Sequence, residues 1–182
     1  MHVEQDINKI MEKIKYNKTY NFSLTNRSKS IYGLVLYRND NFTTIINNPV
    51  DYVIDGVRYI NNQKLKSIVL EKQLSKDKIM NSKLIIFLEN DKRYLNIEFS
   101  NFKDLFDYLK EKNIFCELSL SKENTVFIGK TINAQQDSID IDFYDKNFRL
   151  VDNAFVKFED ITSVTILSDY ADTIANVAMN LY

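Results

Sequence analysis

A hydrophobic pattern recurs in this 182-residue chain at a separation of 96 residues. At this offset Ile31-Tyr32-Gly33 superposes on Phe127-Ile128-Gly129, and residues 65–70 superpose on residues 161–166. Few aligned residues are identical, but the hydrophobic positions and the two glycines agree. Self-similarity at a fixed separation is typical of a repeated supersecondary unit. The sequence therefore predicts two related units rather than one domain.

Each expected unit begins with a helical pattern and continues as five short alternating segments. Apolar residues fall at i, i+3, i+4 and i+7 within residues 102–109, with Asn101 as a candidate N-cap and Asn113 as a candidate stop. Residues 7–14 have the same helical spacing in the first unit. Alternation predicts strands at residues 20–25, 30–38, 42–48, 56–61 and 65–71, and at residues 115–120, 125–133, 138–144, 153–158 and 161–167.

Two further segments lie outside these units. Residues 83–99 alternate around Asn90-Asp91-Lys92, which predicts a hairpin turn between two strands. Apolar residues at helical spacing between Tyr170 and Leu181 predict a C-terminal helix that covers the second unit. The expected division is a first unit over residues 1–76, a connecting β-hairpin over 77–100, and a second unit with the C-terminal helix over 101–182.

A helix followed by five strands, with glycine in the second strand, resembles the Sm-like fold, a small and strongly bent barrel. The resemblance rests on residues 126–132 with Gly129, on residues 137–141 and on residues 161–164. It implies an α+β, mainly β chain in which two Sm-like barrels stand in tandem. RNA-binding members of that family carry a loop Asn and an Arg-Gly pair. Thr44 and Asp140 occupy the Asn positions here, and Lys66-Ser67 and Thr162-Ser163 occupy the Arg-Gly positions.

The net charge of −1 results from two halves of opposite charge. Residues 1–96 contain 16 Lys and Arg against 10 Asp and Glu, whereas residues 97–182 contain 8 against 15. The halves therefore carry +6 and −7, which indicates partners of opposite sign or two halves that face each other. In the basic half, cations lie among tyrosines, a pattern that suits base stacking and phosphate contacts. The candidate RNA-binding residues are Lys15, Lys18, Arg27, Lys29, Arg38 and Arg58.

In the acidic half, carboxylates gather on one expected strand. Asp140 and Asp142 alternate with apolar residues, so both project from one face, and Asp137 and Asp145 lie at the strand ends. We interpret these four residues as a candidate surface for a basic protein partner. A solvated strand face and an oxygen-ligated Mg²⁺ or Ca²⁺ site are the alternatives, although the glycine and distal Glu of a calcium loop are missing.

The sequence lacks the residues that common catalytic and phosphate-binding sites need. The single histidine, His2, excludes a Ser-His-Asp triad, and three isolated glycines exclude a Gly-rich phosphate loop. Cys116 alternates with apolar neighbours and is expected to be buried. We therefore expect no enzyme, no cofactor and no bound metal.

The longest apolar run, residues 84–88, is far below the roughly 18 residues of a membrane span. With no signal-peptide pattern, we expect a cytoplasmic protein with no membrane partner, and the Asn-, Lys- and Ile-rich composition resembles that of bacterial proteins. The leading hypothesis is a non-catalytic binding protein, such as an immunity or adaptor protein that recognises another protein. The alternative is an Sm-like RNA-binding protein that uses the basic half. The oligomeric state stays open, since an unpaired strand edge would allow self-association.

Overall fold

The computed structural model describes residues 15–25, 29–72, 74–90, 98–121 and 126–181. The helix expected over residues 7–14 lies outside these ranges. The chain divides into two compact units, which we call unit 1 (residues 1–55 and 59–98) and unit 2 (residues 56–58 and 99–182). The short segment 56–58 therefore belongs to the second unit although it lies within the first half of the sequence.

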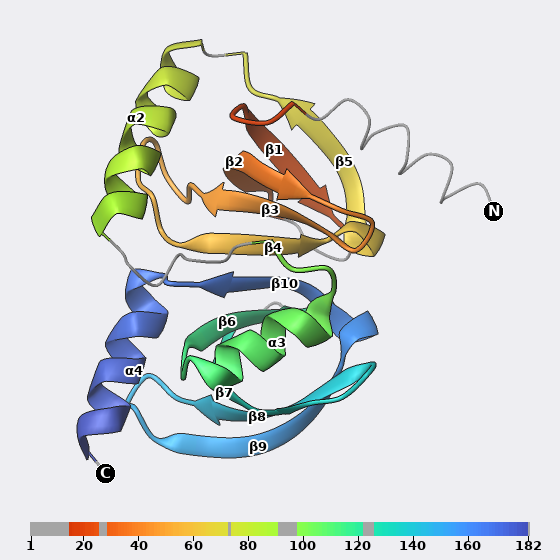
Figure 1. Cartoon of the computed structure of the whole chain (residues 1–182), viewed down its shortest axis with the longest axis vertical. Helices are drawn as coiled ribbons and strands as arrows, with labels where there is room; N and C mark the ends of the chain where they lie inside the picture. The colour runs from red at the N-terminus through yellow and green to blue at the C-terminus, as the bar shows by residue number, and fades with distance from the viewer. Residues whose placement is uncertain (1–14, 26–28, 73, 91–97, 122–125, 182) are drawn as a thin grey trace, which may run out of the picture. The chain divides into compact units, whose positions relative to one another are not determined.

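The ten expected strands are present within a few residues of their expected bounds (Figure 1). The first five are β1 (Thr19–Leu24), β2 (Ile31–Arg38), β3 (Phe42–Asn47), β4 (Val57–Asn61) and β5 (Leu65–Leu70). The second five are β6 (Phe115–Leu120), β7 (Val126–Ala134), β8 (Ser138–Tyr144), β9 (Leu150–Lys157) and β10 (Ile161–Ile166). A single turn of 3-10 helix precedes β5 at Asn62–Lys64 and precedes β10 at Phe158–Asp160.

The prediction of two Sm-like barrel units is wrong. The strands follow one hydrogen-bonded order, β5-β1-β2-β3-β4-β10-β6-β7-β8-β9, which makes a single ten-stranded sheet. Among the described strands no barrel closes, because closure requires the terminal strands of a sheet to pair, and β5 and β9 end this order. Alternation within a strand determines which face each side chain occupies, but it does not determine which strand lies alongside.

The predicted hairpin over residues 83–99 is also wrong. Helix α2 (Leu74–Asn90) occupies most of this segment, and residues 91–97 lie outside the described part of the chain. Met80 and Leu84 of α2 are buried, at the i, i+4 spacing of one helix face. An apolar run such as residues 84–88 suits a strand or a buried helix equally well, so alternation alone was an inadequate criterion.

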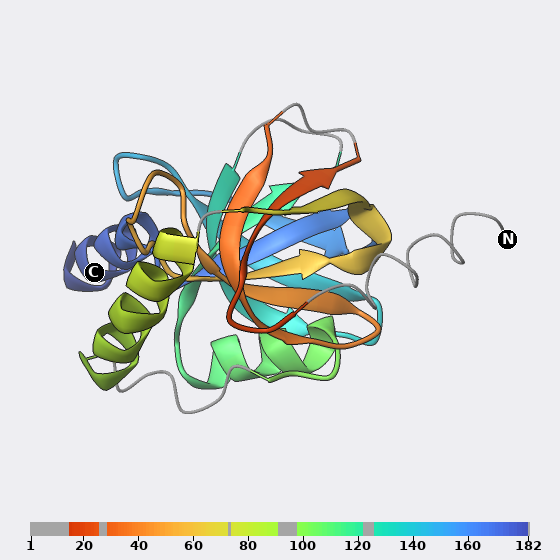
Figure 2. The same cartoon turned by 90° about the horizontal axis from the view of Figure 1, so that it is seen from above.

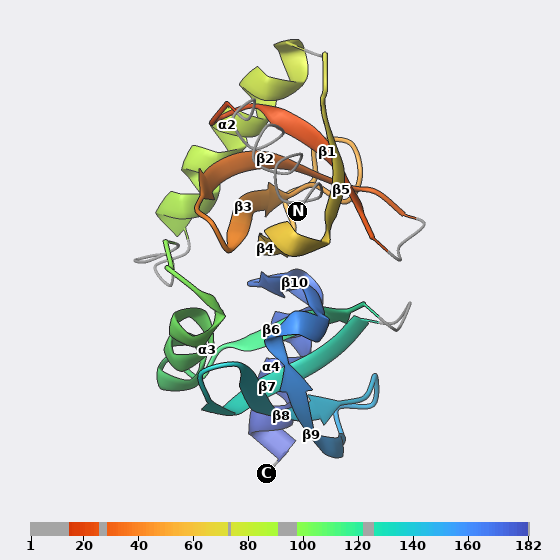
Figure 3. The same cartoon turned by 90° about the vertical axis from the view of Figure 1, so that its right-hand side faces the viewer.

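The two helices predicted for unit 2 are confirmed. Helix α3 (Phe102–Glu111) begins at Asn101, whose side chain accepts a hydrogen bond from the Asp104 N–H at 2.9 Å. It is followed by Asn113 in the left-handed conformation, with φ of 55°, as expected of a stop residue. Helix α4 (Asp169–Leu181) forms at the C-terminus. Figures 2 and 3 show that α3 and α4 lie on different sides of the unit 2 strands.

The two units bury separate hydrophobic cores. In unit 1, side chains from β1, β2, β3, β4 and β5 form one cluster that leaves at most 7% of each member exposed. In unit 2, Phe106 of α3 stacks on Phe102 and on Phe158 at ring-centroid distances of 6.2 and 5.8 Å. Helix α4 packs its Ala171 and Ile174 against Phe115 of β6.

Glycines of β2 and β7 have similar surroundings. A Cβ atom on Gly33 would lie 2.4 Å from the Ile46 carbonyl oxygen and 2.5 Å from the Ile45 side chain. A Cβ atom on Gly129 would lie 2.7 Å from the Ile141 side chain and 2.9 Å from the Asp142 carbonyl oxygen. In both strands the glycine permits a close approach of the next strand.

A buried carboxylate attaches α2 to β1 in unit 1. Asp77 is 6% exposed and accepts hydrogen bonds from the Thr19 N–H at 2.9 Å and from the Lys18 ammonium at 3.1 Å. Burial alone would raise the pKa of Asp77, but these hydrogen bonds stabilise its charged form and hold the pKa below its ordinary 3.8. The charged carboxylate therefore stabilises the folded unit.

We expect Asp77→Asn to lower the stability of unit 1 by about 1–3 kcal/mol near neutral pH, because a charged acceptor is lost from a buried site. Since the folded pKa is depressed, the contribution of Asp77 is present above the unfolded pKa and disappears as pH falls through the folded value. Urea unfolding across this acid range should therefore show the wild type and Asp77→Asn converging. The exposed carboxylate Asp40 provides the control Asp40→Asn, and a pH-independent loss at Asp77 would contradict the explanation.

Candidate functional site

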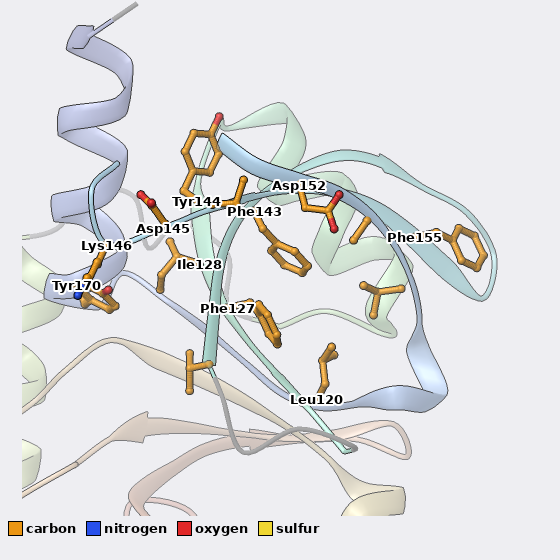
Figure 4. Close-up of a pocket in the computed structure, with 14 residues that line it drawn as sticks. Leu120, Phe127, Ile128, Phe143, Tyr144, Asp145, Lys146, Asp152, Phe155 and Tyr170 are labelled. Atoms are coloured by element: carbon orange, nitrogen blue, oxygen red, sulfur yellow. The ribbon is translucent and has the colours of Figure 1, made fainter. Parts of the chain in front are cut away.

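Unit 2 contains an open groove of about 570 Å³ between its strands (Figure 4). Most of the lining is apolar, and it comes from β6, β7, β8, β9, the turn after β8 and helix α4. The lining residues are Leu120, Val126, Phe127, Ile128, Phe143, Tyr144, Asp145, Lys146, Val151, Asp152, Ala154, Phe155, Val156 and Tyr170. A volume of this size falls within the range of ordinary ligand pockets.

Two stacked aromatic rings form the middle of this groove. Phe127 of β7 and Phe143 of β8 lie 4.8 Å apart between ring centroids, with an interplanar angle of 30°. Figure 4 shows Phe127 and Phe143 together at the centre, Tyr170 near α4 and Phe155 toward the opposite end. Offset aromatic pairs give a rigid apolar surface.

Strand β9 exposes apolar side chains at the rim of this groove. Val151 is 64% exposed and Phe155 is 58% exposed, although both are large hydrophobic residues. Strand β9 pairs with β8 and ends the order of the described strands, so none of those strands lies along its outer side. Neighbouring exposed apolar residues in one surface region are typical of an interaction site.

Charged residues lie at two places in the groove. Asp152 is opposite Phe143 in the β8–β9 register, so the carboxylate and the ring share one face of the sheet. Asp145 and Lys146 lie in the turn after β8, near Tyr170 in Figure 4. The Asp145 carboxylate accepts hydrogen bonds from the backbone N–H groups of Arg149 and Asn147, which lower its pKa below the ordinary value.

The four predicted partner-binding carboxylates are not all in this groove. Asp145 lines it, whereas Asp140 and Asp142 are not among the lining residues. In the register these two lie opposite Phe155 and Asn153, so they share a face of the sheet with Phe155, at the rim of the groove, and not with Phe143. The Asn153 side-chain amide donates to Asp142 at 2.8 Å, and the Ser138 hydroxyl donates to Asp137 at 3.1 Å. Among the described residues, no group of three His, Cys, Asp or Glu side chains is placed to hold a metal ion.

The six candidate RNA-binding cations have different environments. Lys18 is paired with Asp77, and Arg58 lies near Glu117 with its Nε donating to the Thr165 hydroxyl at 2.7 Å. Lys15 and Lys29 are exposed and Arg38 is half-buried. Arg27 lies outside the described residues.

A polar chain in unit 2 connects Arg58 to the start of α4. The Arg58 guanidinium lies 4.0 Å from the Glu117 carboxylate, and both side chains are largely buried. The Ser168 hydroxyl donates to Glu117 and accepts a hydrogen bond from the Ala171 N–H at 3.2 Å. Ser168 thus caps the first turn of α4, and Glu117 orients the capping hydroxyl.

Cys116 is buried, as expected. Burial, followed by the nearby Glu117 charge, raises the pKa of the Cys116 thiol to about 12. A thiol with this pKa is almost entirely protonated near neutral pH, so it is a poor nucleophile.

Sequence reasoning did not single out Phe127, Phe143, Asp152 or Phe155 as site residues. The available signal was in β9, where Leu150 and Val151 precede two polar residues and Phe155 follows them. An apolar residue in a strand is ordinarily assigned to the core, whereas Val151 and Phe155 of β9 are more than half exposed.

No protein family, curated protein or solved structure matches this chain. Among the described residues, none of the helices has the length and apolar content needed to cross a membrane.

Proposed function

We propose that this chain is a non-catalytic binding protein that holds an apolar segment of a protein partner in the unit 2 groove. The observation that carries this proposal is the open, aromatic-floored groove beside the exposed Val151 and Phe155. An uncovered apolar surface is costly in water, and its burial by a partner would provide a favourable free energy of binding.

The contrast with unit 1 supports this interpretation. The core cluster of unit 1 is closed by its own side chains, including Phe22 of β1 and Ile68 of β5. In unit 2 the large apolar residues Val126, Val151 and Phe155 stay exposed around the groove. Because protein interiors are close-packed, an unfilled groove next to these exposed side chains is better explained by an external occupant than by a general packing defect.

Charge favours a basic partner. The groove contains Asp145 and Asp152 against Lys146, and residues 97–182 carry a net charge of −7. Carboxylates beside an apolar surface increase the association rate of a cationic partner and disfavour an acidic one. Inhibition of a basic partner protein, as in an immunity or adaptor role, is the form of binding that these features suit. We place this role in the cytoplasm, where a single buried and unpaired cysteine is usual.

A displayed random-peptide library provides a direct test of the groove. We expect the wild-type protein to enrich peptides that combine aromatic or aliphatic residues with Lys or Arg. The double variant Val151→Ser/Phe155→Ser should bind the selected peptides at least about tenfold more weakly, because exposed apolar anchors dominate such contacts. Both substituted side chains are more than half exposed, so unfolding is not expected to explain the loss.

Val69 of β5 provides a matched control, since it is an edge-strand valine that is 58% exposed. Val69→Ser should leave peptide affinity unchanged. Failure to enrich any peptide, or equal binding by the wild type and the double variant, would refute the proposed groove. If the protein instead bound RNA, with an affinity that weakens steeply as salt is raised, the result would support the alternative in which the basic half binds RNA.

A further inference from the structure

We propose that the occupant of the unit 2 groove is an extended basic segment of the partner that adds to the sheet as a new strand along β9. This inference rests on the proposed function and specifies its binding mode. The partner segment would alternate apolar and basic residues, with the apolar side chains entering the groove.

The backbone of β9 is available for such pairing. Strand β9 pairs with β8 from Ser138↔Lys157 to Tyr144↔Leu150 and stands at the end of the strand order. In an antiparallel pair, every second residue directs its N–H and C=O groups away from the neighbour. The outer side of β9 therefore presents a row of backbone donors and acceptors to an incoming strand.

The middle of β9 lacks the usual protection of an edge strand. Edges are commonly blocked by proline, by inward-pointing lysine or by a bulge. The register irregularity of β9 is confined to the end near Leu150, and its one lysine, Lys157, is at the other end. Residues 153–156 have none of these features, and the charge of Asp152 attracts rather than repels a basic segment.

The groove and the edge are continuous with each other. Five of the lining residues belong to β9, from Val151 to Val156, so an occupant of the groove runs beside the strand. A strand that pairs with β9 would place alternate side chains beside Asp152 and Val156, which share a face with Phe143 and line the groove with it. The Asp152 carboxylate shares that face and would attract a cation flanking the apolar residues.

A second copy of this chain is a poorer fit to the groove. The other strand that ends the order, β5, is basic at Lys66 but directs Leu65 and Ile68 into its own core. Its exposed apolar residues, Val69 and Leu70, are consecutive, so they point to opposite faces of the strand and only one of them could enter a groove on another molecule. The occupant must be a segment whose apolar side chains are free, and strand addition to an edge is a common mode for such segments.

The test uses an acetylated peptide of alternating isoleucine and lysine together with two N-methylated analogues. In an extended strand, residues that share a side-chain face also direct their backbone groups to the same edge. N-methylation of all isoleucines therefore blocks one edge of the peptide, and N-methylation of all lysines blocks the other. Both analogues carry the same kind of modification, so each is the control for the other.

We expect the unmodified peptide to bind, one analogue to retain its affinity, and the other to lose at least about a hundredfold, since several backbone hydrogen bonds are removed. Asp152→Asn should weaken the unmodified peptide about threefold to tenfold, with a smaller difference at high salt. Peptide length should matter up to the span of β9.

Three results would overturn the inference. Equal binding of both analogues would show that the peptide sits in the groove without pairing, which leaves the proposed function intact. If sedimentation showed that the protein self-associates as its concentration rises, and if peptide binding were lost in the associated form, the edge of β9 would be assigned to a second copy of the chain. Absence of binding by the peptide and by every library member would remove the proposed function as well.

Discussion

Gly56→Ala is expected to destabilise unit 2 by about 2–5 kcal/mol. Gly56 has φ of +81°, in the left-handed region where an L side chain is strained. A Cβ atom there would also lie 2.2 Å from the Ile166 carbonyl oxygen and 2.9 Å from the Ser168 nitrogen. Both contacts are with backbone, so the clash cannot be relieved by a side-chain rotation.

Thermal unfolding monitored by circular dichroism measures this effect. A loss of this size should lower the midpoint of the unit 2 transition by roughly 5–15 °C in a chain of this length. Gly56→Asn separates the two causes, because Asn tolerates positive φ but still carries a Cβ atom. We expect Asn to be nearly as destabilising as Ala.

The matched control is Asn113→Gly, which also changes a residue with positive φ, here 55°. Removal of the side chain relieves backbone strain at the end of α3, so stability should stay constant or rise slightly. Full recovery by Gly56→Asn would show that backbone conformation alone requires the glycine. Wild-type stability in Gly56→Ala would contradict both reasons.

The sequence predicted the strands far better than it predicted their arrangement. Alternation locates strands with one face in a core, such as β8, where Ile139 and Ile141 are buried and Asp140 and Asp142 are half-buried. Strands β3 and β10 are buried at every position, so their β-branched residues indicate them more than alternation does. Whether five strands close into a barrel depends on pairing between strands distant in sequence, which alternation does not encode. The helix α2 was missed for a related reason, because its apolar residues suit more than one local structure.

The candidate site was predicted only in part. The acidic character of the second half predicted a partner-binding surface around β8, and one of its four residues, Asp145, lines the groove. Asp140 and Asp142 lie on the other face of β8 from Phe143, because successive residues of a strand point to opposite faces. The groove itself arises from the edge position of β9 and from the packing of Phe127 on Phe143, and both are tertiary features.

Glu117→Ala is expected to cost about 3 kcal/mol, because it leaves the largely buried Arg58 charge without its carboxylate partner. It also removes the acceptor of the Ser168 hydroxyl, which caps α4 through the Ala171 N–H. We therefore expect faster amide hydrogen exchange in the first turn of α4, together with a lower unfolding midpoint. Glu117→Gln keeps an acceptor for Ser168 and should preserve most of the protection of α4 while losing the charge pair.

The Glu117 variants also connect the scaffold to the groove. Tyr170, in the first turn of α4, lines the groove, so loosening this turn should weaken peptide binding even though Glu117 does not line it. Glu117→Ala should then lower peptide affinity more than Glu117→Gln, and Gly56→Ala should act in the same direction, because Gly56 also packs against Ser168. Both Glu117 variants could instead leave the amide hydrogen exchange of α4 and the peptide affinity unchanged. The polar chain would then have no effect on the groove, and the apolar packing of Ala171 and Ile174 alone would position Tyr170.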